Sequence, residues 1–278
     1  MSDNIRRYKA IRNTLNHLYP EQPKGNVSRQ LNTLAALISG IVGSKRSNLP
    51  AIADKVADGN KPESRVKRYY RWIANDTVDA RMYFLPFARM LLTNLAQSVL
   101  FMPMDSSLAG RGCVTLLISV IYKKRALPVA WIVVKGKKGH LAEEVHMELV
   151  EQIHQMVPEG IPVVLLGDGE FDGTRLLAQI ASFIWNYVCR SAKDSVLSKN
   201  DKVFHFDDFP LIKGKPPISV PDVLFTLKAY GPIHAIAWWE EQYKDPLYLV
   251  TNVLSVEVAC CWYKKRLLNQ QLAIKRVR

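Results

Sequence analysis

The stretch IPVVLLGD, from Ile161 to Asp168, restricts the fold more than any other part of this sequence. Its first six residues are all apolar, so the segment offers no polar face to water. A strand without polar alternation is typical of the interior of a sheet that helices cover on both faces. The acidic, glycine-rich sequence GDGEFDG ends the run. The sequence therefore predicts an α/β fold with carboxylates collected at the end of a central strand.

Strand and helix patterns on either side of this segment complete the sheet. Three apolar runs separated by short turns precede it, which is typical of an antiparallel meander. A stretch rich in Pro, Gly and Lys later interrupts the pattern and is interpreted as a β-rich insertion. We therefore predict a mixed sheet with helices on both faces. The expected strands span 98–105, 113–122, 127–134, 161–168, 185–191 and 246–253, the expected helices 141–157, 173–184 and 255–278, and the insertion about 195–245.

The first hundred residues have helical rather than strand periodicity. A short helix with Ser47 or Asn48 as cap is followed by the polar turn DGNKP and by a helix that mixes basic and aromatic residues. This outline is typical of a helix-turn-helix, although a helical bundle with a solvated basic face gives the same pattern. We expect a DNA-binding domain at 1–97 and a catalytic domain at 98–278. The candidate DNA contacts in the basic helix are Arg65, Lys67, Arg68 and Arg71.

The positive charge lies mainly at the two ends of the chain. The formal net charge is +13, and residues 1–70 contain 13 Lys and Arg against 5 Asp and Glu. Residues 263–278 contain six basic residues and no acidic one, whereas the middle of the chain is close to neutral. Basic ends around a neutral body indicate a partner that is a polyanion, with double-stranded DNA as the expected one, although they can also serve solubility.

Several classes of protein are not expected. The N-terminal sequence is polar and basic, and the longest apolar run is about half of what a membrane span needs, so we expect neither a signal peptide nor a membrane protein. Four cysteines without C-x-x-C spacing indicate a reduced, cytoplasmic protein. No phosphate-binding loop occurs, so no nucleotide cofactor is expected. The histidines and glutamates of 140–154 do not share a helix face and are interpreted as a solvated surface rather than a zinc site.

Two carboxylates are the candidates for catalysis. Asp105 ends the first expected core strand and Asp168 the fourth, and these strands can lie side by side. Paired carboxylates repel each other unless a cation lies between them, and hard oxygen ligands favour Mg²⁺ or Mn²⁺. Two such ions support phosphodiester cleavage. The alternative for Asp168 is a simple turn after the strand, and Glu170 and Asp172 are interpreted as turn or cap residues.

The motifs MDSS, LLGDGEFDG and TN followed by YKKR resemble, in order and spacing, the insertion-sequence transposases of the DDE type with a Y-x-x-R-x-x-x-E signature. The resemblance spans most of 27–266. It implies an RNase H-like core, Mg²⁺- or Mn²⁺-dependent cleavage of transposon ends, joining to target DNA, and work as a homodimer. On this match Asp105 and Asp168 are the first two catalytic acids. The signature helix that approaches the DNA end contains Tyr263, Lys264 and Arg266.

The chain departs from this signature at its third acid. Gln270 stands where the pattern requires glutamate, and a neutral amide cannot replace a carboxylate as ligand or base. We expect a truncated element, while a partner that supplies the end, or Glu257 acting instead, are the alternatives. The function is therefore predicted to be an impaired transposase. The alternatives are an inactive DNA-binding remnant that represses transposition, or a cellular RNase H-like nuclease.

Overall fold

The computed structural model describes residues 3–19, 22–56, 58–96, 98–123 and 125–277, and only the backbone of 80–81 and 267–277. The chain divides into two compact units, Met1–Leu91 and Leu92–Arg278, which we name the helical unit and the sheet unit. The boundary expected at residue 97 falls on a residue outside the described ones. It stays a prediction, and each unit is described by itself.

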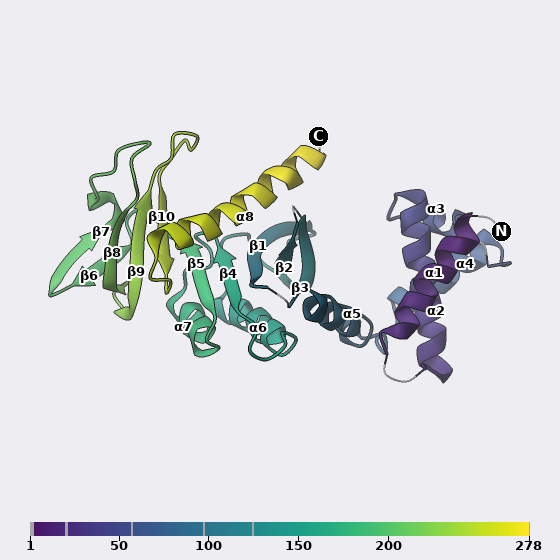
Figure 1. Cartoon of the computed structure of the whole chain (residues 1–278). Helices are drawn as coiled ribbons and strands as arrows, with labels where there is room; N and C mark the ends of the chain where they lie inside the picture. The colour runs from purple at the N-terminus through teal and green to yellow at the C-terminus, as the bar shows by residue number, and fades with distance from the viewer. Residues whose placement is uncertain (1–2, 20–21, 57, 97, 124, 278) are drawn as a thin grey trace. The chain divides into compact units, whose positions relative to one another are not determined.

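The helical unit includes a short helix and a basic helix joined by a polar turn. The side chain of Asn48 accepts a hydrogen bond of 3.0 Å from the amide of Ala51 and so caps the short helix, as expected. Tyr69 of the basic helix is fully buried against Ile52 and Ala53 of the short one. In the described part of the chain no helix is long and apolar enough to cross a membrane. The helices are α1 (Asp3–His17), α2 (Gly25–Ser44), α3 (Leu49–Asp54), α4 (Pro62–Ile73) and α5 (Ala80–Leu95), the last of which runs across the boundary between the units (Figure 1).

The sheet unit contains one mixed sheet with the strand order β3-β2-β1-β4-β5-β10-β9-β8-β6-β7. Strands β1 to β3 form an antiparallel meander, and β1, β4 and β5 run parallel to one another. This arrangement of the first five strands is RNase H-like, which confirms the fold expected from the sequence. The strands are β1 (Leu100–Gly110), β2 (Cys113–Tyr122), β3 (Arg125–Lys135), β4 (Val163–Gly167), β5 (Asn186–Arg190), β6 (Val196–Lys199), β7 (Lys202–His205), β8 (Ile218–Phe225), β9 (Tyr230–Trp238) and β10 (Leu247–Thr251).

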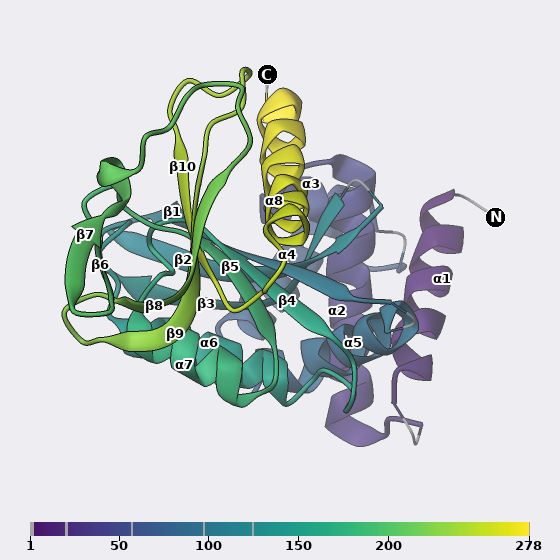
Figure 2. The ribbon, with the colours of Figure 1, turned by 60° about the vertical axis from the view of Figure 1, so that its left-hand side comes forward.

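Helices cover both faces of the core of this sheet. Helices α6 (Glu143–His154) and α7 (Thr174–Ser182) lie on one face, and α8 (Val256–Val277) lies on the other (Figure 2). Strand β4 is buried at every residue, which explains its lack of polar alternation. The expected insertion adds β6 to β9 to the edge beyond β10, so it extends the same sheet instead of forming a second one.

The pairing of β1 with β4 determines where the two candidate acids lie. The parallel register pairs Pro103 with Leu166, and two further residues along each chain bring Asp105 beside Asp168. Strand β1 does not end at Asp105 as expected, because it continues to Gly110 in its pairing with β2. Asp105 therefore stands just past the point where β1 stops pairing with β4, at a rigid position inside a strand.

Candidate active site

The carboxylates of Asp105 and Asp168 face one guanidinium group. The Nη2 atom of Arg266 lies 2.8 Å from Oδ2 of Asp168 and 4.0 Å from Oδ1 of Asp105. The arginine is almost fully buried, whereas the side chain of Asp105 is 47% exposed and that of Asp168 is 32% exposed. The sequence-predicted pair is thus brought together at one sheet edge, open to solvent on one side and backed by a buried cation.

The turn after β4 holds Asp168 by backbone contacts. Its Oδ1 accepts a hydrogen bond of 3.2 Å from the amide of Glu170, and its carbonyl accepts one of 3.0 Å from the amide of Phe171. Gly167 allows this turn, since a Cβ atom there would lie 2.7 Å from Cβ of Phe171 and 2.9 Å from Sγ of Cys189. Phe171 and Cys189 are fully buried, so neither can retreat. A residue larger than glycine would therefore displace the turn that carries Asp168.

A second polar group, formed by Ser106, Glu170 and His146, lies on the face of β1 opposite to Asp105. Successive residues of a strand point to opposite faces, so Ser106 points away from the side of Asp105. The hydroxyl of Ser106 donates a hydrogen bond of 2.5 Å to Oε2 of Glu170. The other oxygen of Glu170, Oε1, lies 3.8 Å from Nε2 of His146 on α6. Among the described residues neither of these two atoms has a hydrogen-bond partner.

The sequence interpretation of this second group was wrong for His146. His146 is 3% exposed and packs edge-on against Phe171 with ring centres 5.1 Å apart, so it does not belong to a solvated helix surface. Burial lowers the pKa of His146, although the charge of Glu170 opposes that shift. Glu170 lies in the turn after β4, as expected, but its side chain is more than nine-tenths buried and accepts a hydrogen bond from Ser106 of β1. A strongly polar helix sequence gave no signal of this burial.

The start of α7 is capped from another helix. Oε1 of Glu143 accepts hydrogen bonds of 2.9 Å and 3.0 Å from the amides of Arg175 and Leu176. The cap expected from Asp172 is not made, since its carboxylate accepts a hydrogen bond of 2.6 Å from the hydroxyl of Ser191 instead. Burial raises the pKa of Asp172, and that hydrogen bond opposes the rise. The carboxylate of Glu143 therefore stabilises the helix end that a side chain of the turn was expected to cap.

The signature residues on α8 lie mainly against the sheet. The spacing of Tyr263 and Arg266 puts both on one helix face, and this face is the buried one, with exposed fractions of 1% and 3%. Burial raises the pKa of Tyr263 to about 12. Lys264 forms an ion pair with Glu240. Tyr263 and Arg266 thus pack against the sheet and are not on a surface where DNA was expected to bind. The side chain of Gln270 lies outside the described residues.

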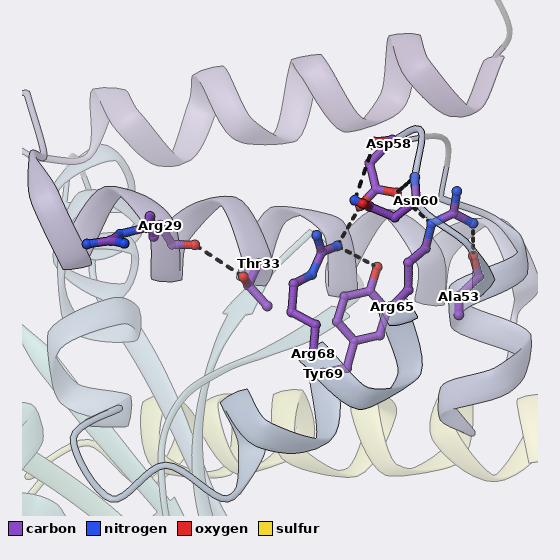
Figure 3. A network of polar contacts seen from close by, with 8 residues as sticks. All are labelled: Arg29, Thr33, Ala53, Asp58, Asn60, Arg65, Arg68 and Tyr69. Atoms are coloured by element: carbon purple, nitrogen blue, oxygen red, sulfur yellow. Dashed lines mark hydrogen bonds and ion pairs between the residues drawn. The ribbon is translucent and has the colours of Figure 1, made fainter. Parts of the chain in front are cut away.

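The basic helix α4 divides its four candidate DNA contacts between the interior and the surface. Nε of Arg65 and Nη2 of Arg68 lie 2.6 Å and 2.7 Å from the two carboxylate oxygens of Asp58 in the preceding turn. Arg65 also donates a hydrogen bond of 2.9 Å to the carbonyl of Ala53, as Figure 3 shows. These two arginines connect α4 to the preceding turn and to α3, whereas Lys67 and Arg71 are exposed.

The carboxylate pair fits a divalent cation. Both side chains already converge on one positive group, and carboxylate oxygens are the ligands that Mg²⁺ and Mn²⁺ prefer. Two protein ligands suffice for Mg²⁺, because this ion keeps several of its waters. A different acidic group, formed by His205, Asp207 and Asp208, brings its ligand atoms within 4.8 Å of one another, but two of its members are exposed and it lies at the insertion.

Comparisons with known proteins identify no family. No protein-family model matches the sequence, and no curated protein matches it. A piggyBac transposase synaptic complex with hairpin DNA aligns with 12% identity and a TM-score of 0.45, over 98% of this chain and 65% of that one. Endonuclease V of Ciona intestinalis, in complex with inosine-containing DNA, aligns with 13% identity and a TM-score of 0.35, over 76% and 99%. The present chain thus spans about two thirds of the length of that transposase, and its fold is assigned from its own sheet order.

Proposed function

We propose that this protein is a metal-dependent enzyme that cleaves phosphodiester bonds in DNA, and specifically a transposase of the DDE type. The observation that supports this function best is the convergence of Asp105 and Asp168 from adjacent parallel strands on one cationic group. In this proposal the two carboxylates bind Mg²⁺ or Mn²⁺. The chemistry that such ions supply is activation of a water and stabilisation of the leaving oxygen.

Basic side chains of both units are proposed to bind the DNA backbone. Lys67 and Arg71 are exposed on α4 in the helical unit, and Lys264 is partly exposed on α8 in the sheet unit. Lysine and arginine bind phosphates without reading sequence, which suits a chain that carries a net charge of +13. A homodimer on paired transposon ends belongs to the same proposal.

Cleavage of end-labelled DNA tests this function. Supercoiled plasmid and linear duplexes are incubated with the protein and Mg²⁺ or Mn²⁺, with Asp105→Asn and Asp168→Asn as matched variants that keep side-chain size. We expect metal-dependent nicking by the natural chain and a loss of at least 100-fold in either variant, because each removes a charged ligand. Nicking that both variants retain would contradict the assignment.

A second function, repression by a DNA-binding remnant, is favoured by one observation. Gln270 stands at the position of the third acid, and an amide is a weaker ligand than a carboxylate. The two functions separate with Gln270→Glu. A transposase limited by this position gains cleavage in the variant, whereas a remnant binds DNA equally well in both forms and cleaves in neither.

A further inference from the structure

We propose that Ser106 and Glu170 are positioning residues that fix the separation of Asp105 and Asp168 from beneath the sheet edge. This inference rests on the proposed metal site. Ser106 directly follows the first acid, and Glu170 comes two residues after the second. Their 2.5 Å hydrogen bond is therefore a side-chain link between the two chain segments that carry the ligands.

Both acids also form hydrogen bonds with the backbone of the two residues that make this link. Oδ1 of Asp105 accepts a hydrogen bond of 3.0 Å from the amide of Ser106, and Oδ1 of Asp168 accepts one of 3.2 Å from the amide of Glu170. Each acid thus binds the backbone of the residue whose side chain forms the link. A shift of either segment changes both the link and the orientation of a carboxylate.

The burial of the link indicates that it does not contact metal or DNA itself. Ser106 is 2% exposed and the side chain of Glu170 is 9% exposed, on the face of β1 opposite to Asp105. His146 lies next to it at 3.8 Å without forming a hydrogen bond, so among the described residues Ser106 provides the one hydrogen bond that this carboxyl group accepts. Loss of that bond would leave the buried carboxyl group with no hydrogen bond, which is costly in the interior.

Substitutions can separate positioning from direct coordination. Ser106→Ala removes the donor, Ser106→Thr keeps it, and Glu170→Gln keeps an acceptor oxygen without charge. Ser107→Ala is the matched control, because Ser107 is the neighbouring exposed serine. Ser106→Ala leaves a buried carboxylate without a partner and endangers folding. The double variant Ser106→Ala/Glu170→Met therefore removes both partners of the link, so that neither is left without the other.

The experiment measures Mn²⁺ affinity by electron paramagnetic resonance and amide hydrogen exchange of 168–171, on the full chain. We expect Ser106→Ala and the double variant to bind Mn²⁺ about 10- to 100-fold more weakly, the range typical for residues that orient metal ligands. Exchange of the 168–171 amides should rise while β5 and β10 stay protected. Ser106→Thr, Glu170→Gln and Ser107→Ala should stay within about 3-fold of the natural chain.

The outcomes distinguish this inference from the proposed function. Natural affinity in the double variant, with unchanged exchange at 168–171, would overturn the positioning role alone. A large loss of Mn²⁺ affinity in Glu170→Gln would also overturn it, because Glu170 would then act as a ligand through its charge. If the natural chain binds no Mn²⁺, the metal site itself is wrong, and the exchange measurement decides whether the link still holds the turn.

Discussion

The Nη2 atom of Arg266 lies 2.8 Å from Oδ2 of Asp168, although the two residues are 98 positions apart in the chain. The same nitrogen is 4.0 Å from Oδ1 of Asp105, so one guanidinium faces both candidate ligands and offsets one of their two negative charges. The guanidinium of Arg266 therefore lies where a positive charge reduces the repulsion between the two carboxylates. A divalent ion at this pair has to compete with, or displace, that group.

Substitution of Arg266 tests this competition. Arg266→Met keeps an unbranched side chain but removes the charge, so we expect Mn²⁺ affinity to rise by about 10-fold. The metal-free variant should lose about 1 kcal/mol of stability, because two close carboxylates then lack a counter-ion but remain partly screened by solvent. Thermal unfolding with and without Mn²⁺ measures both effects, and added Mn²⁺ should restore part of the loss.

The control for this variant is Arg175→Met. Arg175 forms an ion pair with Glu144 on the exposed surface, where such pairs contribute about 0–1 kcal/mol. We expect neither Mn²⁺ affinity nor stability to change in it. Unchanged or weaker Mn²⁺ binding in Arg266→Met is the result that opposes a competing role for Arg266.

The two glycines beside Asp168 form a natural pair for testing the turn. Gly167→Ala places a methyl group 2.7 Å from the buried Phe171, so we expect a loss of about 1–3 kcal/mol and weaker Mn²⁺ binding. Gly169→Ala meets its nearest atom at 3.9 Å and should be close to neutral. Chemical unfolding of both variants measures the difference, and equal stabilities would show that the close packing at Gly167 is not limiting.

The ion pairs of Asp58 make the helical unit sensitive to acid. Burial raises the pKa of Asp58, but hydrogen bonds from Arg65 and Arg68 outweigh it and lower the pKa to about 2. A carboxyl whose pKa is lowered by folding stabilises the protein above its unfolded pKa, and this stability is lost as the pH falls toward the folded value. We expect about 2 kcal/mol to be lost between about pH 4 and pH 2, after allowance for partial screening by solvent.

Asp58→Asn should remove this acid-dependent part of the stability. The variant is expected to be less stable at pH 5 and to differ little from the natural chain near pH 2. Asp54→Asn is the matched control, since Asp54 is exposed on the adjacent helix. Thermal unfolding at both pH values provides the measurement, and an equal loss at pH 5 and pH 2 would exclude the ion pairs as its cause.

Lys67 and Arg71 are predicted to contact DNA phosphates. Lys67→Ala and Arg71→Ala should each weaken binding to any duplex and lower the slope of log affinity against log salt by about 0.9. Arg12→Ala, an exposed change on α1, is the control. Fluorescence anisotropy at several salt concentrations measures the slopes. A loss confined to one DNA sequence would point to base recognition instead.

The sequence predicted the elements that depend on local pattern. The apolar run at Ile161–Leu166 predicted a central strand because a short, wholly apolar run is typical of a strand covered on both faces. The approach of Asp105 to Asp168 followed from the expectation that their two strands lie side by side, which the pairing of β1 with β4 bears out. The role of the pair in metal binding stays a prediction.

The parts that failed depend on which helix face is buried. The spacing of Tyr263 and Arg266 shows that they share a face, but spacing cannot tell a face packed on a sheet from one turned to DNA. The burial of Arg65 could not be predicted either, since its partner Asp58 lies in a turn whose backbone path the sequence pattern does not predict. His146 is buried among acidic neighbours, which hydrophobic periodicity does not report.

Titration of the metal-free protein with Mn²⁺, followed by electron paramagnetic resonance, tests the carboxylate pair most directly. The natural chain, Asp105→Asn and Asp168→Asn are compared at equal concentration. Saturable binding by the natural chain that weakens at least 10-fold in each variant is the predicted result. Binding of equal strength in all three proteins, or no binding by the natural chain, would contradict a metal site at Asp105 and Asp168.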